Sequence, residues 1–451
     1  MSRLTIGREI TVVKGALRHG ILVAASMVAG IGAQANAQAT SLDSAVRREV
    51  IDTIAAQVER IYVDADTGRM IAAKVRERQR AGAYDVSEPA RLSQLLTADL
   101  RSVNHDLHLS VSHSPGNPGG GGRAGGGALA FLGKANHFAL GRVDVLPGNI
   151  GYLEINGFSV DQAARDAIVG ALKYVQTTDA MIIDLRRNRG GDANLVNFLI
   201  SHFTGTDTLA SLTVKVRAGN RSFTRYTMAS VPGPRRPDVP LYVLTSRATG
   251  SAGEDCAFVL KNLKRATIIG DRTAGAGHNV SIVSSGHGFQ TGISFSRVSD
   301  PRTGQEWEQV GVQPDVKVDV ATALDVAQSM ALKTIAAKAD DAVRPGLELI
   351  LESVEARVRP REVPAARLAT YEGEYDGNRR LFVANGKLMY ESPIGGLAEQ
   401  LLPLSDSVFI ASTQARLAFE RDARGGTQLR VRGVDGVATV FAKKPETPRQ
   451  Q

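Results

Sequence analysis

Ser251 is the residue whose surroundings best suit a nucleophile. Residues 241–244 form a short apolar run that predicts a buried strand, a polar glycine-containing turn follows, and a helix-like segment comes next. Ser251 stands where the turn becomes the helix, beside free backbone N–H groups and the positive end of the helix dipole. Both a serine nucleophile and a developing oxyanion benefit from these conditions.

Ser251 also has a purely structural interpretation. Glu254 lies three residues further on, so the pair has the spacing of a capping box, which needs no chemistry. The local pattern alone leaves both interpretations open. Cys256, the only cysteine, lies within the helix-like segment beside Ala257 and Phe258, which indicates a buried structural thiol and not a second nucleophile.

A second set of reactive side chains lies further towards the N-terminus, at His105, Asp106, His108 and His113. Imidazole and carboxylate are common metal ligands, so a metal site is one interpretation. A single general base is the other, and we favour it, because histidine alone titrates near neutral pH without perturbation.

The segment Arg189-Gly190-Gly191-Asp192 lies between a predicted strand and a predicted helix. Paired glycines there leave backbone N–H groups free to face a ligand, as in an oxyanion hole, although a plain turn fits equally well. No G-x-x-x-x-G-K or G-x-G-x-x-G phosphate motif occurs at this turn. Glu308, in the loop WEQVGVQPD, reads as surface charge when taken alone.

Length and charge limit the class of protein. A chain of 451 residues is expected to form two or three domains, and 43% apolar residues can build their cores. The net charge is +8 and no basic run occurs, which gives only weak support for a nucleic-acid or membrane-surface partner. The sequence contains no uninterrupted run of eighteen apolar residues, so it predicts no membrane span.

The first 37 residues resemble a transport signal. Basic residues come first, residues 20–33 are small and apolar, and Ala35-Asn36-Ala37 offers a cleavage site. Its removal would lower the net charge to about +5. An exported chain with one cysteine cannot form an intrachain disulfide, so we expect a periplasmic or secreted protein that depends on its hydrophobic core.

The elements that must position these residues follow a simple order. A helical module is expected at 41–111, a glycine-rich linker at 112–127, an α/β core at 128–320, a helical connector at 321–360 and a β-rich domain at 365–445. Strands alternating with helices predict a mostly parallel sheet with both faces covered. Asn385-Gly386 and Asp435-Gly436 predict hairpins in the last domain.

Taken together, these stretches resemble the tail-specific, or carboxyl-terminal-processing, serine peptidases, in the branch that includes the tricorn core and the interphotoreceptor retinoid-binding protein repeats. The resemblance covers about residues 45–320 apart from the linker. It rests on six stretches in the family's order: AGAYDVSEPARLSQLLTADLRSVNHDLHL, VLPGNIGYLEINGF, MIIDLRRNRGGD, YVLTSRATGSAGED, RATIIGDRTAGAGHN and WEQVGVQPD.

The resemblance implies a crotonase/ClpP-like spiral α/β core, an N-terminal three-helix domain and Ser251 as the nucleophile. It also implies His108 as the base and Glu308 as the carboxylate that orients it. The oxyanion hole would be the N–H of Ala252 with that of Gly190 or Gly191.

Three departures accompany the resemblance. The lysine branch places its base 25 residues after the serine, where this chain has Ala276, so a Ser–Lys dyad is excluded. Leu107 replaces a serine that bridges histidine and glutamate in tricorn-like members, and Gly250 and Gly253 are expected to loosen the turn around the nucleophile. No peptide-binding insert of the PDZ type is recognisable.

The sequence therefore predicts a serine peptidase that uses no cofactor and no metal and acts on a peptide or protein substrate. The alternative is a catalytically weak or inactive relative that binds a peptide or an apolar ligand. A third possibility, a metal hydrolase built on His105, His108 and His113, follows from the histidine cluster. The sequence does not predict an oligomeric state.

Overall fold

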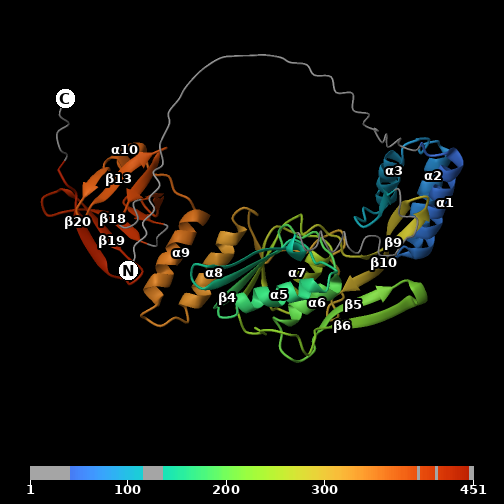
Figure 1. Cartoon of the computed structure of the whole chain (residues 1–451), viewed down its shortest axis with the longest axis horizontal. Helices are drawn as coiled ribbons and strands as arrows, with labels where there is room; N and C mark the ends of the chain where they lie inside the picture. The colour runs from blue at the N-terminus through green and yellow to red at the C-terminus, as the bar shows by residue number, and fades with distance from the viewer. Residues whose placement is uncertain (1–40, 115–135, 394–396, 412–414, 446–451) are drawn as a thin grey trace, which may run out of the picture. The chain divides into compact units, whose positions relative to one another are not determined.

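Three helices begin the part of the chain that the computed structural model describes, which comprises residues 41–114, 136–393, 397–411 and 415–445. They are α1 (Ser44–Ile61), α2 (Ala65–Arg80) and α3 (Pro89–Arg101) (Figure 1). Asp43 and Asp64 cap the first two by accepting backbone N–H groups, and Pro89 begins the third. The predicted signal peptide, residues 1–37, lies outside the described residues.

The short strand β1 (Ser110–His113) joins this helical part to the rest of the molecule. It pairs antiparallel with β10 (Phe289–Ser299), and Phe289 and Ile293 of β10 share one hydrophobic cluster with the apolar faces of α1–α3. Ser112 and His113, expected at the start of the linker, thus belong to a strand. The remainder of the predicted linker, from residue 115 to 127, lies outside the described residues.

A six-stranded sheet forms the centre of the core. Its strands run in the order β11-β8-β7-β4-β3-β2, parallel except for the pair β2–β3. The strands are β2 (Leu140–Leu146), β3 (Ile150–Ile155), β4 (Ala180–Asp184), β7 (Leu241–Thr245), β8 (Thr267–Gly270) and β11 (Val316–Lys317).

Helices cover both faces of this sheet. One face packs against α5 (Ala163–Tyr174), α6 (Ala193–Ser201) and α7 (Ala252–Asn262), and the other against α8 (Ala323–Ala336) and α9 (Arg344–Val358). Alternate residues of each strand face alternate clusters, as Leu153 and Tyr152 of β3 do, which explains the continuous apolar runs of β3, β4 and β7. The α/β fold class that the sequence predicts is confirmed.

A second sheet lies beside the helical part and the core. Its strands follow the order β1-β10-β5-β6, with β9 (Asn279–Gly286) on the other side of β10. The strands β5 (Ala210–Val216) and β6 (Arg221–Tyr226) form a hairpin around the turn η2 (Ala218–Asn220). A further short turn, η1 (His137–Ala139), precedes β2.

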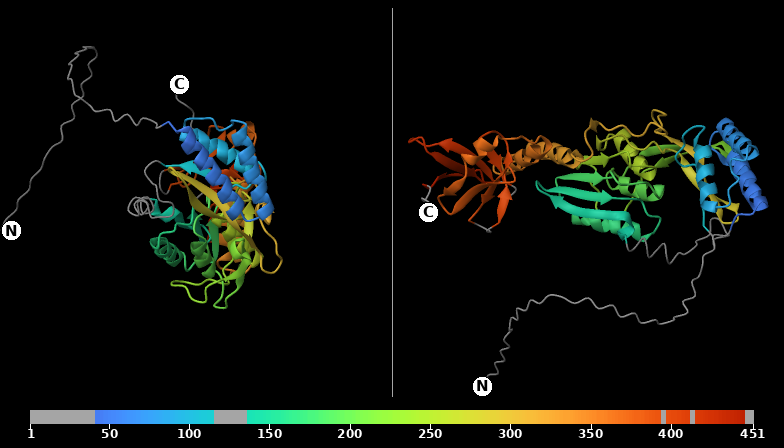
Figure 2. Two further views of the ribbon diagram at one scale, coloured as in Figure 1. Left: turned by 90° about the vertical axis from the view of Figure 1, so that its right-hand side faces the viewer. Right: turned by 90° about the horizontal axis from the view of Figure 1, so that it is seen from above.

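The C-terminal part is rich in strands, as Figure 2 shows. After α10 (Ala365–Ala369), a four-stranded and a five-stranded antiparallel sheet enclose aromatic side chains that include Tyr371, Phe409 and Phe419. Asn385 and Gly386, both with positive φ, form the predicted hairpin turn. The strands are β12 (Gly373–Tyr375), β13 (Arg379–Ala384), β14 (Lys387–Glu391), β15 (Ala398–Gln400), β16 (Leu402–Pro403), β17 (Val408–Ile410), β18 (Arg416–Arg421), β19 (Thr427–Arg432) and β20 (Ala438–Ala442).

None of the described helices has the length and apolar character needed to cross a membrane.

Candidate active site

Ser251 follows the turn after β7 and lies immediately before α7, in a strained backbone conformation. Its φ of 50° and ψ of −118° fall outside the regions that a residue with a Cβ normally occupies. Such strain costs on the order of 1–3 kcal/mol and persists only where the surroundings impose it. Here Thr249 donates its hydroxyl to the Leu185 carbonyl at 2.7 Å, and the Gly250 N–H donates to the Asn188 carbonyl at 2.9 Å.

The capping-box pair predicted as the alternative role of Ser251 is also present. The Ser251 N–H donates to Glu254 Oε2 at 2.8 Å, whereas the hydroxyl faces the Glu254 amide without forming a cap hydrogen bond. The buried Glu254 carboxylate also accepts the N–H groups of Gly275 and Ala276, at 2.6 and 2.8 Å. Capping therefore uses mainly the backbone of Ser251 and leaves the hydroxyl available.

The His108 imidazole meets that hydroxyl. Its Nε2 lies 3.3 Å from Ser251 Oγ, although the two residues are 143 positions apart. Arg101, at the end of α3, holds the His108 loop by donating to the carbonyls of Leu107 and Leu109, each at 2.7 Å. Burial lowers the pKa of His108, which favours the neutral imidazole that can accept a proton.

Asp106 is the carboxylate next to His108. Its Oδ1 accepts the backbone N–H of His108 at 2.9 Å and lies 3.8 Å from His108 Nδ1, a buried atom without a hydrogen-bond partner among the described residues. Burial opposes ionisation of Asp106, but the hydrogen bond and the charge of His278, with the nearby Ser294 hydroxyl and the His108 N–H, outweigh it and lower the pKa to about 2. Asp106 is therefore a fully buried anion beside the imidazole.

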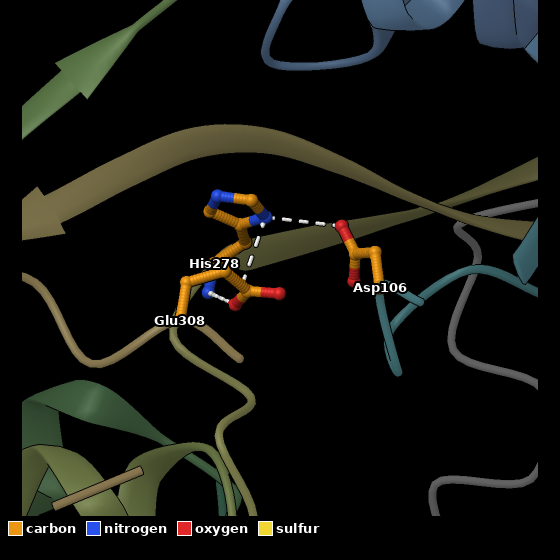
Figure 3. Close-up of side chains that lie close together, drawn as sticks. All are labelled: Asp106, His278 and Glu308. Atoms are coloured by element: carbon orange, nitrogen blue, oxygen red, sulfur yellow. Dashed lines mark hydrogen bonds and ion pairs between the residues drawn. The ribbon is translucent and has the colours of Figure 1, made fainter. Parts of the chain in front are cut away.

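His278 also contacts Asp106, as Figure 3 shows. Its Nδ1 lies 3.0 Å from Asp106 Oδ2, which also accepts the Tyr62 hydroxyl at 3.0 Å. The histidine side chain is 6% exposed. His278 was not among the residues predicted from the sequence, where it is one histidine after a run of glycines and alanines with no partner nearby.

Glu308 lies one step further from His108 than the resemblance implies. Its Oε2 accepts the backbone N–H groups of Gly277 and His278, at 2.6 and 3.0 Å, and lies 3.7 Å from His278 Nδ1 (Figure 3). No contact joins it to His108 among the described residues. Burial, reinforced by the charge of Asp106, raises the pKa of Glu308 to about 7, although His278 opposes the shift.

Asp106, His278 and Glu308 also have the residue types of a metal site, with one candidate ligand atom from each within 4.8 Å of the others. The separation of 3.0 Å between His278 Nδ1 and Asp106 Oδ2 is that of a direct hydrogen bond. The histidine cluster suggested by the sequence does not assemble in the described part of the chain. Only His108 approaches Ser251, whereas the His113 ring packs on Phe289 with centroids 4.6 Å apart.

The backbone around Gly190 and Gly191 approaches Ser251 closely. A Cβ added to Gly190 would come within 2.7 Å of Ser251 Cβ, and one on Gly191 within 1.9 Å of the Phe158 carbonyl oxygen. The Gly190 N–H already donates to Asn188 Oδ1 at 2.9 Å. For Gly191 and Ala252, which line the cavity at Ser251, no hydrogen bond from the N–H group is found within the described residues.

This cavity is small, about 40 Å³, and is lined in part by Ala193, Val298 and Trp307. A larger cavity of about 510 Å³ lies beside Asn149, Asp179 and Pro240, which precede β3, β4 and β7, whereas Ser251 follows β7. The two linings share no residue. Cavity volume therefore does not indicate the candidate site. The smaller cavity is the candidate, because Ser251 lines it.

Gly253 does not loosen the turn in the way expected from the sequence. A Cβ at this position would come within 2.9 Å of both the Asn188 carbonyl oxygen and Asn188 Oδ1, and the Gly253 N–H donates to the Gly250 carbonyl at 2.9 Å. Glycine is required by this close approach. Leu107, which replaces the bridging serine of tricorn-like members, is 45% exposed.

Comparison with known proteins matches residues 149–318 to the family model described as peptidase family S41. The carboxyl-terminal-processing protease of Synechocystis sp. is 26% identical over 229 residues, which cover 50% of this chain and 50% of that protein. The chloroplastic C-terminal processing peptidase of Tetradesmus obliquus is 29% identical over 180 residues, covering 38% of this chain and 35% of that protein. The chain thus spans half or less of the length of these relatives.

Among solved structures, a lipoprotein from Streptococcus agalactiae is 17% identical to this chain. The match covers 64% of this chain and 96% of that one, with a TM-score of 0.47.

Proposed function

Residues 149–318 of this chain belong to peptidase family S41, and from this premise we propose that the protein is a serine peptidase that cleaves a polypeptide through an acyl-enzyme on Ser251. The observation that carries the proposal is the distance of 3.3 Å between Ser251 Oγ and His108 Nε2. A nucleophile and a base within hydrogen-bond reach are the minimum requirement for this chemistry.

In the first step, Ser251 Oγ attacks the carbonyl carbon of the scissile bond while its proton passes to His108 Nε2. The carbonyl oxygen becomes an oxyanion, which the N–H groups of Gly191 and Ala252 are placed to receive. We choose Gly191 over Gly190 because the Gly190 N–H already donates to Asn188. Loss of one such donor typically raises the barrier by about 2.7–4 kcal/mol.

In the second step, the imidazolium donates its proton to the leaving nitrogen and the C–N bond breaks. A water molecule then gives a proton to His108 as it attacks the ester carbonyl, and His108 returns that proton to Ser251 Oγ as the ester C–O bond breaks. Asp106 carries the negative charge that faces Nδ1 of the imidazolium in both steps, at 3.8 Å in this structure. A small rotation of either side chain would convert this separation into a hydrogen bond.

The finer predictions from the sequence belong to the same proposal. They are a crotonase/ClpP-like spiral arrangement of the core, a periplasmic or secreted location and a peptide or protein as substrate. The presence of a parallel sheet with helices on both faces supports the first. The resemblance of residues 1–37 to a transport signal supports the second.

One observation favours the alternative of a binding protein that does not cleave its ligand. Ser251 and Glu254 have the arrangement of a capping box in which the serine hydroxyl faces the Glu254 N–H, a role that would retain the serine in a protein without activity. Recovery of an intact peptide or apolar ligand from the purified protein, together with an unreactive Ser251, would support this function.

The direct test is peptide-bond hydrolysis by Ser251→Ala. We expect turnover of an unstructured protein substrate, measured by release of new amino termini, to fall by at least about 10³-fold, because removal of a triad member leaves only the contribution of the oxyanion hole and binding. Ser222→Ala, the same change at an exposed position of β6, serves as the matched control. Equal turnover by Ser251→Ala and the unmodified protein would rule out the mechanism.

A further inference from the structure

His278 occupies an unusual position for a residue that does not touch the nucleophile. Its buried ring has Asp106 on one side and Glu308 on the other, and the edge of the ring faces Tyr62, with centroids 6.4 Å apart. Asp106 and Tyr62 come from the N-terminal part of the chain, whereas Glu308 comes from the loop before β11. The imidazole is thus enclosed by charged and polar groups from both parts.

These groups form a continuous series that ends at the serine. The separations are 3.7 Å from Glu308 to His278, 3.0 Å from His278 to Asp106, 3.8 Å from Asp106 to His108 and 3.3 Å from His108 to Ser251. The 3.0 and 3.3 Å separations are hydrogen-bond distances, and the others are ion-pair distances. These side-chain contacts thus connect His278 to Ser251 through Asp106 and His108, and His278 also lines the cavity at Ser251.

The two oxygens of Asp106 have different partners. Oδ2 accepts from Tyr62 and lies at hydrogen-bond distance from His278 Nδ1, whereas Oδ1 accepts the His108 backbone N–H. Because Tyr62 and His278 hold Oδ2, the other oxygen, Oδ1, faces the imidazole of His108. Loss of the His278 contact would leave Asp106 held by the Tyr62 hydroxyl on Oδ2 and the His108 N–H on Oδ1, so its rotamer would be fixed less firmly.

We propose that His278 is a positioning residue for the peptidase reaction: through an N–H on Nδ1, it holds Asp106 in the rotamer that keeps His108 oriented towards Ser251. Glu308 supports His278 by fixing the backbone of Gly277 and His278. This inference rests on the function proposed above and extends it to a residue one step beyond the base.

Two substitutions at His278 separate positioning from simple packing. Phenylalanine fills the space of the ring without a donor, whereas asparagine places an amide group near the position of Nδ1. We expect His278→Phe to lower kcat about 10- to 100-fold with little change in KM, as typical for loss of a group that orients an imidazole. We expect His278→Asn to recover most of that loss.

The pH profile provides a readout that a packing role would not alter. Without the His278 donor, Asp106 binds a proton at higher pH, and without the nearby imidazole, His108 does the same. Both changes shift the acidic limb of kcat/KM for His278→Phe to higher pH. His202→Asn is the matched control, because His202 is buried and its Nδ1 contacts the Pro234 carbonyl oxygen at 2.8 Å, outside this series.

The results distinguish this inference from the function on which it rests. Turnover retained by Ser251→Ala would overturn both. An inactive Ser251→Ala together with a folded His278→Phe of unchanged kcat and pH profile would overturn the inference alone. Inhibition of the unmodified protein by added Zn²⁺ that His278→Phe abolishes would assign the cluster to a metal site and also overturn it.

Discussion

The surroundings of Ser251 and His108 fix these two residues in different ways. Ser251 is held in a conformation that strains its backbone, and its N–H group is already bound to Glu254. His108 is held by its loop, while its Nδ1 has no hydrogen-bond partner in the part of the chain that the structure describes. The proposed nucleophile is thus fixed by its own turn, and the proposed base depends on neighbouring side chains for its orientation.

Glu308 provides a prediction at this scale that concerns stability and not catalysis. Its pKa is raised from 4.5 to about 7, so the folded protein binds a proton at this site more strongly than the unfolded chain does. Stability from this group is fully present below pH 4.5 and is lost as the pH rises to 7. Glu308→Gln cannot ionise and should avoid a loss of up to about 3 kcal/mol.

Thermal unfolding at several pH values tests this prediction. The melting temperature of Glu308→Gln relative to the unmodified protein should increase between pH 5 and pH 8. Glu306→Gln, at an exposed position two residues earlier, controls for the change of residue type. A difference that stays constant with pH, or that falls as pH rises, would contradict the account of Glu308.

At the scale of elements, the loop between α3 and β1 is as important as the turn at Ser251. Pairing of β1 with β10 fixes one end of this loop, and Arg101 of α3 donates to two of its carbonyls. Hydrogen bonds of this kind to a charged donor contribute about 1.5–3 kcal/mol each. Arg101 therefore determines where His108 lies without touching it.

Substitution of Arg101 should lower activity as well as stability. We expect Arg101→Met to lower kcat about 10-fold or more, because a displacement of about 1 Å at a reacting group can cost 10²-fold. Arg91→Met, at an exposed position of the same helix, should have little effect. A kcat for Arg101→Met equal to that of the control would show that pairing of β1 alone is enough to hold the loop.

At the scale of the whole molecule, the site unites the helical part with the α/β core. Further hydrogen bonds accompany His108 across this boundary. Arg217 donates to the carbonyls of Glu59 and Tyr62 at 2.8 and 2.7 Å, and Gln57 donates to the Ser284 carbonyl at 2.7 Å. Activity should therefore require the folded helical part in its place on the core.

Much of this arrangement follows from local patterns in the sequence. The apolar runs predict β3, β4 and β7, and the Asn-Gly pair predicts a hairpin, because periodicity and turn chemistry act over a few residues. The site is different. His278 contacts Asp106 although the two are 172 positions apart, and the sequence around each residue does not indicate that the other lies nearby. Glu308 resembles surface charge in sequence for the same reason, and only packing buries it.

Rotamers and close approach account for the remaining differences. The sequence provides Gly253 as a flexible residue, whereas the fold presses it against Asn188. Likewise, the resemblance assigns Glu308 to His108, and packing instead inserts His278 and Asp106 between them. Such details depend on the distance between elements, which a linear pattern does not contain.

In the proposed mechanism His108 activates Ser251, and the rate at which a fluorophosphonate modifies Ser251 measures that activation. This reaction requires the activated serine but no recognition of a peptide. We predict modification at Ser251 in the unmodified protein, at least about 100-fold slower modification in folded His108→Gln, and an unchanged rate in the neighbouring control His105→Asn. Equal rates in His108→Gln and the unmodified protein would contradict the account.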